Sequence, residues 1–124
     1  MSARISIVLV SFLAACGGDD GGGAADAAID TPASTIMLVD PCPGTVDATI
    51  TTLASRFDPA TATITQGQVV KFVSTATHPI GAQPGTETTL AVPEGQTKCF
   101  RFTAARAYSY KCNVHGYVGT LTVN

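Results

Sequence analysis

The sequence contains few of the residues that usually carry chemistry. In 124 residues it has two histidines, four cysteines, two methionines and no tryptophan. It has nine acidic and seven basic residues and no basic block, so we expect no nucleic-acid partner. Histidines and acids are scarce, so the chain lacks the residues that most hydrolytic active sites need. We expect no enzyme activity. A chain of this length forms one small domain.

The pattern of the chain favours β structure. Eighteen threonines are present and coiled-coil heptads are absent. Apolar residues alternate with polar ones in several short segments, and Tyr108, Tyr110 and Cys112 share one face of such a segment. Further segments are 46–51, 62–65, 69–73 and 98–103, with a weaker candidate at 86–92 and a last strand in which Leu121 and Val123 share a face. Six to eight short strands without a convincing helix indicate an all-β sandwich over residues 40–124.

The first fifteen residues have the pattern of an export signal. Arg4 precedes an apolar run over residues 5–13, which is too short for a permanent membrane span. The run ends in Leu-Ala-Ala-Cys at Cys16, which resembles the lipobox of bacterial lipoproteins. That resemblance implies that residues 1–15 are removed and that Cys16 carries lipid. An ordinary secretory signal with an incidental cysteine is the alternative.

Residues 16–39 are predicted to be a tether between Cys16 and the domain. The segment begins Cys-Gly-Gly-Asp-Asp-Gly-Gly-Gly and continues with alanine and aspartate, a composition that buries too little apolar surface to fold by itself. We expect the protein to be anchored to the bacterial envelope, facing the periplasm or the exterior. Gly17 stands where some bacteria place the aspartate that signals inner-membrane retention, which slightly favours the outer membrane.

Both histidines lie in positions suited to metal binding. Cys112 and His115 are three residues apart in Cys-Asn-Val-His, directly after a strand rich in aromatic residues. His78 follows the predicted strand 69–73. One thiolate and two imidazoles form the ligand set of a trigonal His₂Cys copper site. A lone histidine is more often a simple surface or core residue, but here neither histidine is left over.

The same residues resemble the plastocyanin/azurin-like cupredoxins. The resemblance covers residues 57–124 and rests on Phe-Asp-Pro at 57–59, Gln-Gly-Gln-Val-Val-Lys-Phe at 66–72, His78, and the run 108–116, Tyr-Ser-Tyr-Lys-Cys-Asn-Val-His-Gly. It implies a Greek-key β-sandwich with the metal near one end. It also implies a single copper ion, cycling between Cu(I) and Cu(II), with His78, Cys112 and His115 as ligands.

The sequence departs from that family at the weak axial ligand, which is usually a methionine near the end of the ligand loop. Tyr117 stands there instead, and Met37 lies in or near the expected tether. We therefore expect the axial position to be empty and walled by Tyr117 or Val118, or to be filled by a carbonyl such as that of Thr77. The axial ligand helps to set the reduction potential, and loss of its sulfur favours a higher one.

The remaining cysteines are expected to form a bridge. If Cys16 carries lipid and Cys112 binds copper, Cys42 and Cys99 pair in an oxidising compartment. Two free thiols, or a bridge from Cys112 to one of them, are the alternatives, and spacing alone does not fix the connectivity.

The function predicted from these features is a lipid-anchored blue copper protein that carries single electrons. The edge of His115 would be the electron port, and the partner would be a redox protein such as a cytochrome or an oxidoreductase. We expect a monomer. The main alternative is copper storage, delivery or sensing without a redox partner. A catalytic open copper site and a metal-free β-sandwich that binds another protein are further alternatives.

Overall fold

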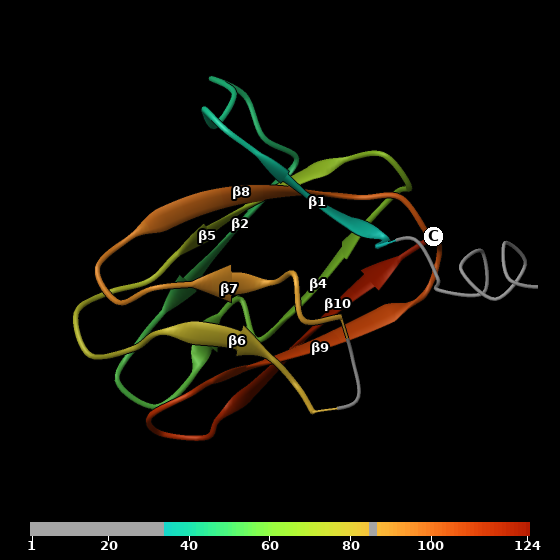
Figure 1. Cartoon of the computed structure of the whole chain (residues 1–124). Coiled ribbons are helices and arrows are strands. Elements are labelled where there is room, and N and C mark those ends of the chain that lie inside the picture. Colours follow the sequence, from blue (N-terminus) through green and yellow to red (C-terminus); the bar gives the residue numbers. More distant parts are fainter. Residues whose placement is uncertain (1–33, 85–86) are drawn as a thin grey trace, which may run out of the picture. The chain divides into compact units, whose positions relative to one another are not determined.

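The computed structural model describes residues 34–84 and 87–124 (Figure 1). These residues form strands and no helix: β1 (Ile36–Val39), β2 (Ala48–Thr52), β3 (Phe57–Asp58), β4 (Thr61–Ile64), β5 (Val69–Val73), β6 (Ile80–Ala82), β7 (Ala91–Val92), β8 (Thr97–Phe102), β9 (Ala107–Cys112) and β10 (Val118–Val123). Among them no helix is long and apolar enough to cross a membrane. The predicted count of six to eight strands was too low, because β1, β3 and β6 were missed, and strands of two to four residues leave no periodic pattern.

The strands form two five-stranded sheets, which confirms the predicted all-β sandwich. One sheet has the order β1-β8-β5-β2-β3 and the other β4-β10-β9-β6-β7. The predicted strand, turn and strand over residues 62–73 are β4, a turn and β5, but these two strands belong to different sheets. Gly67, in the left-handed region at φ 83°, lies in this turn, and its N–H donates to the carbonyl of Phe102. The turn therefore crosses between the layers.

The core lies between the sheets and is rich in aromatic rings. Along β9, buried residues alternate with more exposed ones, and Tyr108, Tyr110 and Cys112 share the buried face as predicted. Phe72 of β5 meets Tyr110 edge to face, with 5.2 Å between ring centroids. Phe102 of β8 meets Tyr108 in the same way at 4.9 Å. Such pairs across the layers fix how the two sheets pack on each other.

The domain begins earlier than residue 40, so that predicted boundary is corrected. Ile36 pairs with Phe102 as β1 joins the edge of β8, and the Ile36 side chain is buried in the core. The pairing partner is more than sixty residues away, so local composition did not indicate this strand. The signal peptide, Cys16 and residues 16–33 of the expected tether lie outside the described residues.

The weaker strand candidate at 86–92 is reduced to β7, Ala91–Val92. Glu87 is used differently: its carboxylate accepts hydrogen bonds from the N–H of Thr35 at 3.0 Å and from its hydroxyl at 2.7 Å, and pairs with Arg106 at 3.0 Å. The hydrogen bond from the Thr35 backbone is the largest cause that holds the pKa of Glu87 below its ordinary value. This carboxylate thus fastens the first described residues to the start of β9.

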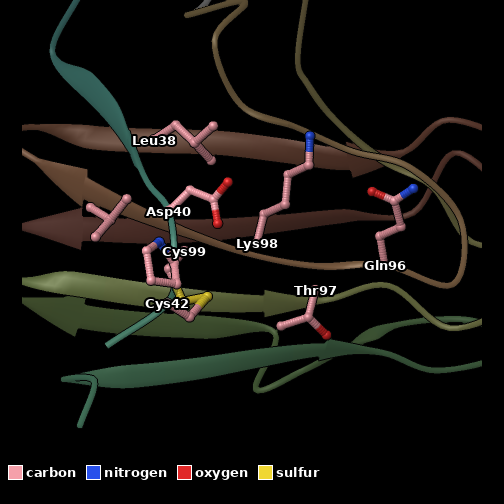
Figure 2. Close-up of a pocket in the computed structure, with 9 residues that line it drawn as sticks. Leu38, Asp40, Cys42, Gln96, Thr97, Lys98 and Cys99 are labelled. Atoms are coloured by element: carbon pink, nitrogen blue, oxygen red, sulfur yellow. A yellow bond between two sulfur atoms is a disulfide. The ribbon is translucent and has the colours of Figure 1, made fainter. Parts of the chain in front are cut away.

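A disulfide joins Cys42 to Cys99, which confirms the predicted bridge. The bridge lies beside a groove of about 420 Å³. Figure 2 shows the bridge together with Asp40, Gln96 and Lys98, which line the same groove. The side chains that line the groove include none of the three candidate metal ligands. Cys99 points to the outer face of β8, where the segment after β1 covers it.

Removal of the bridge should destabilise the domain. It closes a loop with a sequence separation of 57, which corresponds to about 4 kcal/mol in the chain-entropy model. In urea, the free energy of unfolding of the double variant Cys42→Ala/Cys99→Ala should be about 4 kcal/mol lower than that of the wild type. Wild-type protein treated with a thiol reductant should unfold at the same urea concentration as the double variant, and an unchanged midpoint in either case would contradict the prediction.

Gly119 should not tolerate a side chain. It lies opposite Tyr110 in the register of β9 and β10, and a Cβ atom there would overlap the Tyr110 ring. Gly119→Ala should therefore lower the free energy of unfolding by about 1–3 kcal/mol. Gly44→Ala is the matched control, because a Cβ atom there meets nothing within 4 Å. Equal thermal midpoints for the two variants would show that the Tyr110 ring moves aside at no cost.

Candidate metal centre

A tight turn after β9 places Cys112 and His115 on one side of the chain. The N–H of Gly116 donates to the carbonyl of Cys112 at 2.8 Å, and Gly116 takes a left-handed φ of 76°. The N–H of Cys112 donates to the carbonyl of Tyr117 at 3.0 Å, which closes the loop. In such a helix-like turn, side chains three positions apart face the same direction. The spacing Cys-x-x-His therefore brings sulfur and imidazole together.

His78 comes from the loop between β5 and β6. Its N–H donates to the carbonyl of Thr75 at 3.2 Å, and the hydroxyl of the buried Ser74 donates to the His78 carbonyl at 2.9 Å. Thr77, just before it, has a φ of 68°, which is unusual for a β-branched residue. Short-range hydrogen bonds at His78 and Ser74 thus hold a loop in which Thr77 takes a backbone conformation that a free chain would rarely adopt.

The structure brings His78, Cys112 and His115 into one cluster. The sulfur of Cys112 lies 3.8 Å from Nδ1 of His78 and 3.6 Å from Nδ1 of His115, and the potential ligand atoms all lie within 4.8 Å of one another. Cys112 is buried, His78 is half-buried and His115 is exposed. The cluster therefore has a shielded sulfur on one side and an accessible imidazole on the other.

These separations fit a single metal ion. Metal–nitrogen distances of about 2.0–2.1 Å and metal–sulfur distances of about 2.3 Å, combined at tetrahedral to trigonal angles, place nitrogen and sulfur about 3.6–3.8 Å apart. Both observed separations, 3.8 and 3.6 Å, agree with that range. Two imidazoles and one thiolate suit copper, whereas hard ions such as Mg²⁺ prefer oxygen.

Tyr117 packs beside the cluster. Its hydroxyl donates to the carbonyl of Leu53 at 2.7 Å and lies 3.2 Å from Nδ1 of His78. Burial, followed by the hydrogen bond and the charge of Cys112, raises the pKa of Tyr117 to about 12. The other two residues considered for the axial position are exposed: Val118 begins β10, and Thr77 lies in the loop before His78. Met37 lies on β1, where 54% of its side chain is exposed.

The sequence and the structure were compared with those of known proteins. No protein-family model matches the sequence, and no protein of curated function matches it. Amicyanin from Paracoccus versutus has a similar structure, with 16% identity, coverage of 74% of this chain and 100% of that one, and a TM-score of 0.59. A reduced Cu(I) form of an amicyanin variant is 17% identical, with coverage of 73% of this chain and 100% of that one, and a TM-score of 0.60. A purple cupredoxin from Nitrosopumilus maritimus is 25% identical, with coverage of 63% of this chain and 100% of that one, and a TM-score of 0.52.

The described domain has the cupredoxin fold. This confirms the resemblance to cupredoxins inferred from the sequence, and the three clustered side chains form a possible metal site in this domain. Within this domain, His78 comes from the β5–β6 loop, Cys112 from the end of β9 and His115 from the β9–β10 loop.

Sequence reasoning missed the residues that support the His78 loop. Thr52, fully buried at the end of β2, accepts a hydrogen bond from the N–H of Thr75 at 2.8 Å. The two threonine hydroxyls lie 2.9 Å apart. The only sequence signal was a threonine at the end of a strand, in a chain that has many. The contact joins residues 23 positions apart, so it follows from the pairing of β2 with β5 and not from any local motif.

This support should be measurable in the metal-free protein. Thr52→Val keeps the shape of the side chain but leaves the N–H of Thr75 without its acceptor, so the free energy of unfolding should fall by about 1–3 kcal/mol. Thr49→Val on the same strand is the matched control, because Thr49 is exposed, and its effect should stay within about 0.5 kcal/mol. Equal urea midpoints for both variants would rule out a supporting role for Thr52.

Proposed function

We propose that this protein binds one copper ion through His78, Cys112 and His115 and carries single electrons. The observation that carries the proposal is the cluster itself, in which a buried sulfur and two imidazole nitrogens lie within 4.8 Å of one another. The cupredoxin fold supports it, since structures of similar fold include a Cu(I) form of an amicyanin variant. No substrate-activating group accompanies the cluster among the described residues, so we propose a carrier and not an enzyme.

The protein would supply a fixed set of ligands. A copper ion contributes a one-electron couple, and a soft thiolate with two imidazoles suits both of its oxidation states. Cys112 is buried at the end of β9, and the His78 loop is held by Ser74 and by the Thr52–Thr75 contacts. Ligands fixed in this way by hydrogen bonds and packing keep their positions when the charge of the site changes.

Electrons would enter and leave through His115. Its side chain is exposed, whereas Cys112 is fully buried, so the imidazole is the ligand that a partner protein can reach. Val114, beside it, has 62% of its side chain exposed. We propose that a redox protein such as a cytochrome or an oxidoreductase contacts this end of a monomeric domain.

We further propose that the domain is held at the bacterial envelope by lipid on Cys16. The support comes from the sequence: an apolar run ends in Leu-Ala-Ala-Cys and is followed by a glycine-rich segment. The disulfide between Cys42 and Cys99 is consistent with an oxidising compartment, such as the periplasm or the cell exterior.

Loading the purified protein with Cu(II) tests the copper site. We expect one copper per chain, an intense thiolate-to-copper band in the visible spectrum, and loss of that band in Cys112→Ser. Copper should also raise the stability of the folded state, by about 4 kcal/mol when free copper exceeds the dissociation constant about 1,000-fold. A colourless protein, or colour that survives Cys112→Ser, would disprove the proposal.

Two rates distinguish electron transfer from copper storage or delivery: the rate of electron exchange with a cytochrome and the rate of copper release to a chelator. A carrier should exchange electrons rapidly with a cytochrome while it keeps its copper in the presence of a chelator. A storage or delivery protein should release copper to the chelator and exchange electrons slowly. The second pattern would replace electron transfer with the storage alternative and leave the ligand assignment intact.

A further inference from the structure

The hydroxyl of Tyr117 has one proton to donate and lies near the carbonyl of Leu53, Nδ1 of His78 and the Cys112 side chain. Its distance to the carbonyl of Leu53 is 2.7 Å, and its distance to Nδ1 of His78 is 3.2 Å. A carbonyl oxygen can only accept a hydrogen bond, so the shorter contact takes the proton of the phenol. The lone pairs of the Tyr117 oxygen are then free on the side of His78.

The ring of Tyr117 is held in place from several directions. It packs edge to face on the buried Phe57, with 4.9 Å between centroids, and its backbone carbonyl accepts the N–H of Cys112. Its centroid lies 6.1 Å from the His78 ring and 6.4 Å from the His115 ring. The Tyr117 ring is therefore almost equally distant from the two imidazole rings.

We propose that the Tyr117 oxygen covers the fourth side of the His78–Cys112–His115 centre, as a neutral oxygen donor in place of a sulfur ligand. The inference rests on the copper site of the proposed function. It selects Tyr117 among the sequence-based candidates, because the Tyr117 hydroxyl lies 3.2 Å from a nitrogen of the cluster, whereas Val118 offers only an exposed alkyl group. It also replaces the expectation of an empty axial position.

Two properties follow from an oxygen at this place. A hard oxygen donor favours Cu(II) over Cu(I) when compared with a site that has no axial ligand, so it lowers the reduction potential. A hydroxyl anchored to Leu53 also occupies the space through which a small anion would reach the ion. The native site should thus be closed to external ligands.

The test compares Tyr117→Phe with the wild type, both loaded with Cu(II). Phenylalanine keeps the ring that packs on Phe57 but removes the oxygen. The variant should show changed relative intensities of its visible bands, a higher reduction potential and a gain in azide affinity of about tenfold or more, which corresponds to at least about 1.4 kcal/mol. The wild type should not respond to azide.

Tyr108→Phe is the matched control. It also removes a hydroxyl with two hydrogen-bond partners, Thr35 and the carbonyl of Ala104, but these lie at the start of β9, away from the cluster. Its spectrum, potential and azide response should equal those of the wild type, although its stability falls.

The outcomes separate this proposal from the one on which it rests. A blue wild type whose spectrum, potential and azide response are unchanged in Tyr117→Phe overturns the role of Tyr117 and leaves the copper site standing. A colourless wild type overturns both. A wild type that binds azide has an open fourth side and overturns the proposal even if the variant does not fold.

Discussion

The antiparallel pairing of β6 with β9 is the constraint on which the metal centre depends. It places Ile80 opposite Cys112, and the N–H of Asn113 extends it by donating to the carbonyl of Pro79 at 2.9 Å. His78 is thereby carried to a cysteine 34 positions later in the chain. Gly81 makes the close approach possible, since a Cβ atom there would lie 2.6 Å from the Asn113 side chain. The loop that carries His78 and the loop that carries His115 therefore both depend on this short pairing.

The wall of the site is also part of the core. Tyr117 contacts Phe57, Phe57 contacts Tyr110, and Tyr110 contacts Phe72, each pair edge to face with centroids 4.8 to 5.2 Å apart. This row of rings runs from the ligand loop through both sheets. Because interiors are close-packed, a change in one ring is felt by its neighbours. The position of the Tyr117 hydroxyl is therefore set by the packing of the sandwich as much as by its own loop.

The parts that the sequence predicted are those with a local pattern. Alternation identified the strands around Tyr108 and Leu121, and the short motif from Cys112 to His115 indicated the metal cluster together with His78. The parts that it did not predict depend on partners distant in the chain. β1 is stabilised by β8, and the Tyr117 hydroxyl bonds to Leu53, 64 positions away. No propensity of residues 36–39 or of Tyr117 itself encodes those contacts.

The point at which the chain enters the domain has a mechanical consequence. Thr35 lies by Thr103 and Arg106, at the β8–β9 connection, whereas the β5–β6 and β9–β10 loops lie at the other end of the sandwich (Figure 1). A restraint applied through the residues before β1 therefore acts on the end opposite His115. The contacts nearest to that restraint are those of Thr35 with Glu87 and the first pairs of β1 with β8. A domain held from its N-terminus would thus present the β9–β10 loop, and with it the imidazole of His115, at the end away from the point of attachment.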